Sequence, residues 1–247
     1  MEIFLTSVFG GGKKIDGVWT PTVVNDENGQ LRQLKEAIKG RKNFLYVASN
    51  PTGFAKTDAM ANLAFESFRI SGIEFENMTV LDDRTKSDAK RLVEIADFIM
   101  FTGGHVPTQN AFLQEIGMAE LLKGCKCPIL GQSAGSMNLA KKVYNYPEDE
   151  TEFDDPKYME GMGLTKISIL PHFQLEDMPE GIDLINDYFK KDSVNHTLIA
   201  LIDGSHIRIK GRNAEIFGEA YLFDGGEMSK ICEVGKSCKV SNLNLCK

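Results

Sequence analysis

The fold is decided at residues 128–139, PILGQSAGSMNL, where an apolar run ends in a Gly-Gln-Ser-Ala-Gly turn and a run of small residues begins. This layout is typical of a nucleophile elbow, in which a serine sits on a sharp strand-to-helix turn above the edge of a sheet. Gly131 and Gly135 lack side chains, so strand and helix can pack closely around Ser133. Alone, the motif also fits a glycine-rich turn that opens a packed helix, so its interpretation depends on the rest of the chain.

Strand-like apolar runs alternate with helix-like amphipathic segments on both sides of this turn. The expected strands are residues 2–7, 43–49, 75–81, 98–102, 128–130 and 167–170, and the expected helices are residues 31–38, 58–70, 87–95, 110–123 and 181–189. This alternation predicts a three-layer α/β/α fold with a mostly parallel central sheet. Hairpin-linked segments over residues 197–217 predict antiparallel strands added near the C-terminus. We expect residues 1–247 to form a single domain, with residues 10–14 as a flexible loop because they lack P-loop spacing.

Composition excludes several classes of function. The chain has 247 residues with a net charge of −7 and no long run of Lys or Arg, which argues against nucleic-acid binding. No segment has the length of a membrane helix, and the N-terminus lacks the pattern of a signal peptide. The five cysteines are an odd number without zinc-finger spacing. We therefore expect free thiols in a cytoplasmic protein, with no metal and no cofactor, and with a redox or metal site near the C-terminus as the alternative for the cysteines.

A serine nucleophile needs an adjacent base, and the chain offers four histidines. His172 directly follows an apolar strand, at the kind of strand end that presents catalytic residues, whereas His196 and His206 are expected to be surface and structural residues. A carboxylate should orient the imidazole, but spacing does not choose among the acidic residues that follow the elbow. These candidates are Glu148, Asp149, Glu150, Glu152, Asp154 and Asp155.

Four ordered motifs together carry a family resemblance. They are FTGGH at residues 101–105, followed by Gln109, then GQSAGS at 131–136, LPHF at 170–173 and IDGS at 202–205. The set resembles peptidase family S51, which contains the aspartyl dipeptidases (peptidase E) and the cyanophycinases. The resemblance implies a class I glutamine-amidotransferase-like, flavodoxin-like fold in which serine replaces the cysteine of that fold.

The resemblance also implies roles for individual residues. Ser133 would be the nucleophile, His172 the base, and the amides of Gly104 and Ala134 the oxyanion hole. Glu148 aligns best with the family's acid, and Glu150 and Asp149 are the next candidates. His105 and Gln132 depart from the peptidase E pattern near the substrate, so strict specificity for an N-terminal aspartate is not implied.

The expected function is therefore a serine-type peptidase that hydrolyses short peptides through an acyl-enzyme. The expected partner is a small peptide, and no binding to nucleic acid or to a membrane is expected. A homodimer is possible. An esterase or thioesterase with the same triad is one alternative, and a non-catalytic amidotransferase-like binding domain is another.

Overall fold

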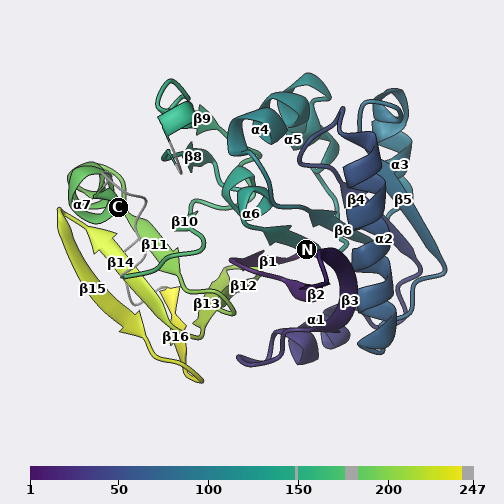
Figure 1. Ribbon diagram of the computed structural model, residues 1–247, viewed down its shortest axis with the longest axis horizontal. Coiled ribbons are helices and arrows are strands. Elements are labelled where there is room, and N and C mark those ends of the chain that lie inside the picture. The colour runs from purple at the N-terminus through teal and green to yellow at the C-terminus, as the bar shows by residue number, and fades with distance from the viewer. Residues whose placement is uncertain (148–149, 176–182, 241–247) are drawn as a thin grey trace.

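An eight-stranded sheet forms the centre of the computed structural model, which describes residues 1–147, 150–175 and 183–240 (Figure 1). Its strand order is β16-β13-β12-β1-β7-β6-β4-β5. The parallel part consists of β1 (Glu2–Thr6), β7 (Ile129–Gln132), β6 (Phe98–Phe101), β4 (Asn43–Val47) and β5 (Asn77–Leu81). The antiparallel part consists of β12 (His206–Lys210), β13 (Asn213–Phe217) and β16 (Ser237–Lys239). The predicted mostly parallel sheet with antiparallel strands near the C-terminus is thus confirmed.

Helices cover both faces of this sheet because its strands are apolar on both sides. Along β4, Phe44 and Tyr46 face one core, whereas Leu45 and Val47 face the other. The first core is completed by α1 (Gln30–Ile38) and α2 (Phe54–Ile70). The second is completed by α3 (Ala89–Ile95), α4 (Val106–Glu115), α5 (Met118–Leu121) and α6 (Ala134–Asn138). Burial on both faces is the reason that these strands read as continuous apolar runs.

A second, four-stranded sheet lies beside the first and appears at the left of Figure 1. It contains β10 (Ser168–Leu170), β11 (Leu198–Leu201), β14 (Ala220–Asp224) and β15 (Glu227–Cys232). An aromatic cluster that includes Tyr144, Phe173, Phe189 and Phe223 packs against it, together with a π-helical turn at Leu184–Phe189 and α7 (Lys190–Ser193). We expected residues 197–217 to be strands linked by hairpins, but β11 and β12 belong to different sheets. The turn between them therefore joins the two sheets.

Two expected elements differ in detail. The helix expected at 110–123 is divided into α4 and α5, because Gly117 adopts the left-handed conformation between them. The glycine-rich segment at 10–14 is not a flexible loop but part of β2 (Gly10–Ile15), which pairs with β3 (Val18–Val24). Asp16 and Gly17 both have positive φ, as a two-residue hairpin turn requires. This hairpin packs on α2 and forms one wall of the cavity described below.

A smaller hairpin follows the elbow helix, where β8 (Lys142–Tyr144) pairs with β9 (Tyr158–Glu160). The acidic stretch of sequence that follows the elbow helix therefore leads into a strand. Across the described segments of the chain, no helix combines the length and the apolar character needed to cross a membrane.

Candidate active site

Ser133 lies at the predicted strand-to-helix turn, between the end of β7 and the start of α6. Its φ of 49° and ψ of −119° are strained for a residue with a side chain, at a cost of about 1–3 kcal/mol. The surrounding contacts impose this conformation. The Ser133 amide donates to Thr6 O at 2.9 Å, and a Cβ added to Gly135 would lie 2.1 Å from Phe101 O. The elbow therefore needs glycine at 135 to keep α6 close to β6.

His172 follows β10 in the second sheet and reaches across to the elbow. Its Nε2 lies 2.9 Å from Ser133 Oγ. The backbone of His172 is also in the left-handed region, with φ of 54°. Among the residues that the structure describes, Ser133, His172 and Asp16 are the non-glycine residues with positive φ. Two of the three thus form the predicted serine–imidazole pair, and backbone strain is typical of such sites.

The carboxylate beside the imidazole belongs to Asp203, in the turn that joins β11 to β12. Asp203 Oδ1 lies 2.8 Å from His172 Nδ1 and accepts a hydrogen bond of 2.7 Å from Ser7 Oγ. Burial alone would raise the pKa of Asp203, but the hydrogen bonds from His172 and Ser7 outweigh it and lower that pKa. An ionised carboxylate only accepts, so Nδ1 carries the ring proton and Nε2 is free to accept from the Ser133 hydroxyl.

The acid predicted from the resemblance, Glu148, lies outside the described residues, as does Asp149, and the side chain of Glu150 is likewise not described. The role predicted for Glu148 stays a prediction. The sequence contained a signal for Asp203, because IDGS is one of the four family motifs and follows an apolar strand. The motif alone does not place Asp203 beside His172, because nothing in the sequence shows that β10 and β11 are parallel neighbours.

The predicted oxyanion residues lie on two sides of Ser133. Gly103 and Gly104 follow β6, and a Cβ added to Gly103 would lie 3.1 Å from Ser133 Cβ. Gly104 has a φ of 155°, and a Cβ there would lie 2.5 Å from Ser49 Oγ, so the turn requires glycine. Ala134 is the first residue of α6, and its amide is one of those that a helix leaves without an internal partner.

Gly103 and Gly104 form a turn after β6, called the glycine turn below. Gln109 lies on α4, belongs to the same family motif as these two glycines, and contacts this turn. Its Nε2 donates to Thr102 O at 3.0 Å, one residue before Gly103. Its Oε1 accepts from Asn138 Nδ2 at 3.1 Å, at the end of the elbow helix. A buried side chain therefore fixes the glycine turn relative to α6, which is what a preformed oxyanion site needs.

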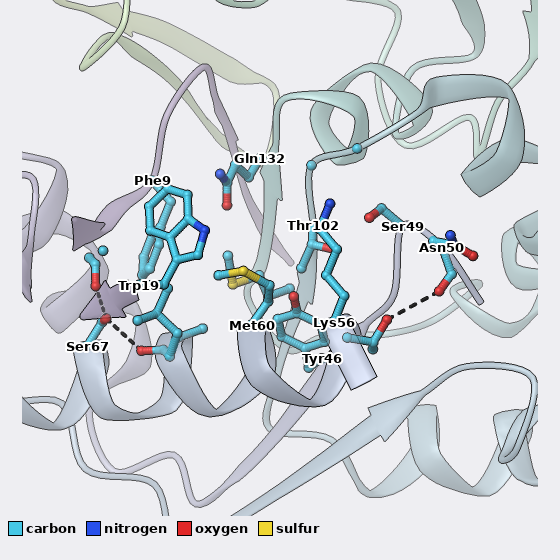
Figure 2. A pocket seen from close by; sticks show the side chains of 18 of the residues that line it. Phe9, Trp19, Tyr46, Ser49, Asn50, Lys56, Met60, Ser67, Thr102 and Gln132 are labelled. Atoms are coloured by element: carbon cyan, nitrogen blue, oxygen red, sulfur yellow. Dashed lines mark hydrogen bonds between the residues drawn. The ribbon is translucent and has the colours of Figure 1, made fainter. Parts of the chain in front are cut away.

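A cavity of about 500 Å³ opens beside the glycine turn, between α2 and the β2–β3 hairpin (Figure 2). Its apolar side chains include Phe9, Trp19, Met60, Leu63 and Met100. Trp19 and Lys56 lie on opposite sides of it in Figure 2. Gly103, Gly104 and Gln132 line the end nearest the elbow, whereas His172 and Asp203 are absent from its described lining. The volume is that of a small-molecule pocket.

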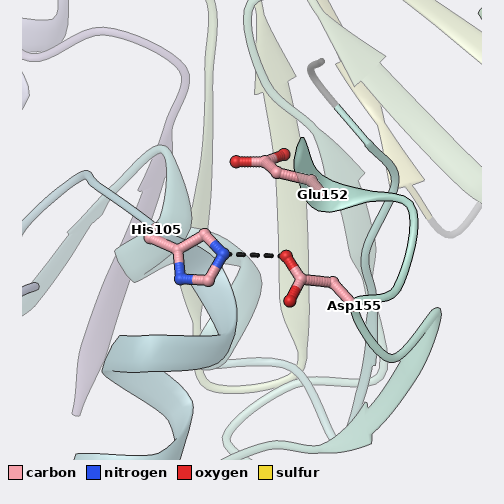
Figure 3. Close-up of side chains that lie close together, drawn as sticks. All are labelled: His105, Glu152 and Asp155. Carbon is pink, nitrogen blue, oxygen red and sulfur yellow. Dashed lines mark hydrogen bonds and ion pairs between the residues drawn. The ribbon is translucent and has the colours of Figure 1, made fainter. Parts of the chain in front are cut away.

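His105 follows the glycine turn and ties it to the loop after the elbow helix (Figure 3). Its Nδ1 accepts from the Thr108 amide at 3.3 Å, so Nε2 carries the proton and donates to Asp155 Oδ2 at 2.8 Å. Donor atoms of His105, Asp155 and Glu152 lie within 4.8 Å of one another, a group that could hold a metal ion. The direct hydrogen bond between His105 and Asp155 explains why these two side chains lie together, and it requires no metal ion.

The remaining histidines are partly or fully enclosed. His206 is buried on β12, stacks on Phe217 and contacts Gln33, in agreement with a structural role. His196, expected at the surface, is half-buried and lies 2.9 Å from Ser168 Oγ. Burial lowers the pKa of each to about 4, so both are neutral near neutral pH.

A serine on an elbow, an imidazole and a carboxylate in hydrogen-bonded series define the geometry of a serine hydrolase. The model of peptidase family S51 matches residues 25–217. The chain therefore belongs to peptidase family S51 and is a serine-type peptidase, as its motifs predicted.

The fold agrees with this membership. A crystal structure of a candidate peptidase E from Listeria monocytogenes EGD-e is similar, with a TM-score of 0.54 and 14% sequence identity over 94% of this chain and 98% of that chain. At this identity the likeness shows the fold alone. The comparison with curated proteins gave no significant match.

Proposed function

We propose that the chain hydrolyses short peptides through an acyl-enzyme formed on Ser133, with His172 as base and Asp203 as the residue that orients it. The observation that carries the proposal is the 2.9 Å contact between His172 Nε2 and Ser133 Oγ, with Asp203 at Nδ1 of the same ring. These are hydrogen-bond distances for a nucleophile and its general base.

In the proposed reaction, His172 takes the Ser133 proton as Oγ attacks the peptide carbonyl. The carbonyl oxygen gains the negative charge and accepts hydrogen bonds from the Gly104 and Ala134 amides. Each such donor contributes about 3–4 kcal/mol to lowering the barrier. His172 then donates the proton to the leaving amine, and the C–N bond breaks. Water, deprotonated by the same imidazole, releases the acid and restores Ser133.

The cavity beside the glycine turn is the proposed site for the side chain on the acyl half of the peptide. The leaving amine must lie next to His172, which protonates it, so the acyl half points away from the imidazole. The cavity adjoins Gly103 and Gln132 on that other side. Its apolar walls and volume favour a bulky apolar side chain over a small one.

The described lining of the cavity contains a lysine and no arginine, so it lacks the bidentate partner that an aspartyl side chain favours. Arg208, on β12, is ion-paired with Glu2 and Glu36 and does not line the cavity. Lys56 supplies an ammonium group within the described lining. A lysine pairs with a carboxylate as a point charge and lacks the bidentate geometry of arginine.

The test combines labelling with turnover. We expect a fluorophosphonate to modify Ser133 in the parent chain, located by peptide mapping, and to leave Ser133→Ala unmodified. On a panel of dipeptides and aminoacyl esters, Ser133→Ala should lose activity, whereas Ser237→Ala, at an exposed serine, should retain it. Equal turnover by Ser133→Ala and the parent would overturn the proposal. Turnover of esters alone would replace the peptidase with an esterase.

A further inference from the structure

A pair of cysteines lies at one end of the strands of the central sheet, and the candidate active site lies at the other end. Cys125 and Cys127 are in the irregular segment before β7, whereas Ser133 follows the other end of that strand. Their Sγ atoms are 3.0 Å apart and share a hydrogen bond. No motif of the sequence gives these two thiols a role, and the proposed peptidase reaction does not use them.

A surface hollow of about 530 Å³ gives access to this pair. Both cysteines line it, Cys125 being partly exposed and Cys127 buried. Its charged lining consists of Arg41, Lys90, Lys123 and Lys126 against Glu94 and Glu120. Lys123 is paired with Glu120 at 2.6 Å, and Lys90 lies 4.0 Å from Glu94. Arg41 and Lys126 are therefore the cations in excess within this lining, and they favour an anionic ligand.

We propose that Cys125 and Cys127 form a thiol–disulfide redox pair that reacts with small disulfides bearing carboxylates. Cys125 is the attacking sulfur, because it is the more exposed of the two and lines the hollow from which a small disulfide would approach. Cys127 is the resolving sulfur, because it already lies in contact with the sulfur that it must attack.

The chemistry balances without a further reactant. The Cys125 thiolate attacks one sulfur of the small disulfide, forming a mixed disulfide and releasing one thiolate. Cys127 then loses its proton to solvent and attacks Cys125, which forms the Cys125–Cys127 bond and releases the second thiolate. The protein loses two electrons and two protons, and the small disulfide becomes two thiols.

The electrostatics of the pair agree with this order. The hydrogen bond between the two thiols lowers the pKa of Cys125, although partial burial opposes the shift. The bond to Cys125 and burial both raise the pKa of Cys127. The lowered pKa of Cys125 favours its thiolate, which is the reacting form.

Cys232 and Cys238 provide internal controls. Each donates only weakly, at 3.8 Å, to a main-chain carbonyl, of Glu233 and Lys239 respectively. Burial raises the pKa of Cys232. Cys238 is half-exposed, like Cys125, so a comparison of the two separates reactivity from access.

The experiment treats the full reduced chain, in the presence of a chelator, with oxidised glutathione or with cationic cystamine. We expect peptide mapping of the parent chain to show a Cys125–Cys127 disulfide, with a mass loss of about 2 Da. In Cys127→Ser the reaction should stop at the mixed disulfide between glutathione and Cys125. The rate with oxidised glutathione relative to cystamine should be about tenfold higher at Cys125 than at Cys238. Changing both Arg41 and Lys126 to Gln should remove that preference.

Three results would overturn the proposal. The first is that Cys125 reacts no faster than Cys238. The second is that the reaction of the parent chain stops at a mixed disulfide. The third is that cystamine reacts with Cys125 as readily as oxidised glutathione does. If Cys127→Ser fails to fold, limited alkylation of the parent chain with iodoacetamide decides the order of attack. Modification of Cys127 before Cys125 would contradict it. None of these readouts depends on peptidase activity, so the proposed function can fail or stand separately.

Discussion

Ser7 and Asp203 share a hydrogen bond of 2.7 Å that connects the two sheets at the candidate active site. Ser7 follows β1 in the central sheet, and the same hydroxyl accepts from the His172 amide at 2.7 Å. One buried side chain thus fixes both the carboxylate and the backbone of the imidazole residue relative to the elbow. The proposed triad takes its residues from both sheets, and Ser7 contacts two of them.

Replacing Ser7 by Ala should lower kcat about tenfold with little change in KM, because the imidazole loses alignment while the substrate cavity stays intact. Ser7→Thr keeps a hydroxyl and should recover part of the loss. Steady-state kinetics with one dipeptide over a range of pH measures both variants. A rise in KM at unchanged kcat would show that Ser7 acts on binding instead.

Asp203→Asn should lower kcat by on the order of 10³- to 10⁴-fold, because a neutral amide neither fixes the ring tautomer nor stabilises the imidazolium. Glu148→Gln is the matched change at the acid predicted from the family resemblance. If Asp203 orients His172, Glu148→Gln should keep nearly full activity in the same assay. The reverse result would assign the role to Glu148.

The serine, the imidazole and the glycine turn could be predicted from sequence because each follows an apolar strand in a local motif. Asp203 also follows an apolar strand in a family motif, but its role and that of Ser7 depend on how two sheets pack together, which a local pattern does not specify. The β2–β3 hairpin was missed for a different reason. Its first strand is glycine-rich, and its stability comes from packing on α2 rather than from strand propensity.

Trp19→Ala should raise KM for dipeptides with a bulky apolar acyl side chain about tenfold and leave small ones unaffected, because the indole forms one wall of the cavity. Trp19 is 50% exposed, so the fold should tolerate the change, and Trp19→Phe should restore binding in part. Trp19 is also the only tryptophan of the chain. Titrating Ser133→Ala with such a dipeptide should therefore change the fluorescence, and an unchanged signal would place the side chain elsewhere.

His206 makes the stability of the fold depend on pH. Burial lowers its pKa to about 4, whereas an unfolded histidine titrates near pH 6.5. Between those values the unfolded chain binds the proton and the folded chain does not, so stability falls as pH falls. The contribution is about 1.4 kcal/mol per pH unit. Denaturant unfolding at several pH values should give a shallower acid slope for His206→Gln than for the parent, and parallel curves would contradict this assignment.

Gly135→Ala should destabilise the fold by about 3 kcal/mol and abolish turnover, because its Cβ would lie 2.1 Å from the carbonyl oxygen of Phe101. Relief of that contact requires α6 to move away from β6, which moves Ser133 away from His172. Gly211→Ala is the matched control, since Gly211 has φ of +61° and no atom within 4 Å of an added Cβ. It should cost about 1 kcal/mol from backbone strain alone and leave kcat unchanged. Urea unfolding and dipeptide turnover on both variants separate the elbow from ordinary glycine strain, and equal losses in the two would show that close packing at residue 135 does not hold the nucleophile in place.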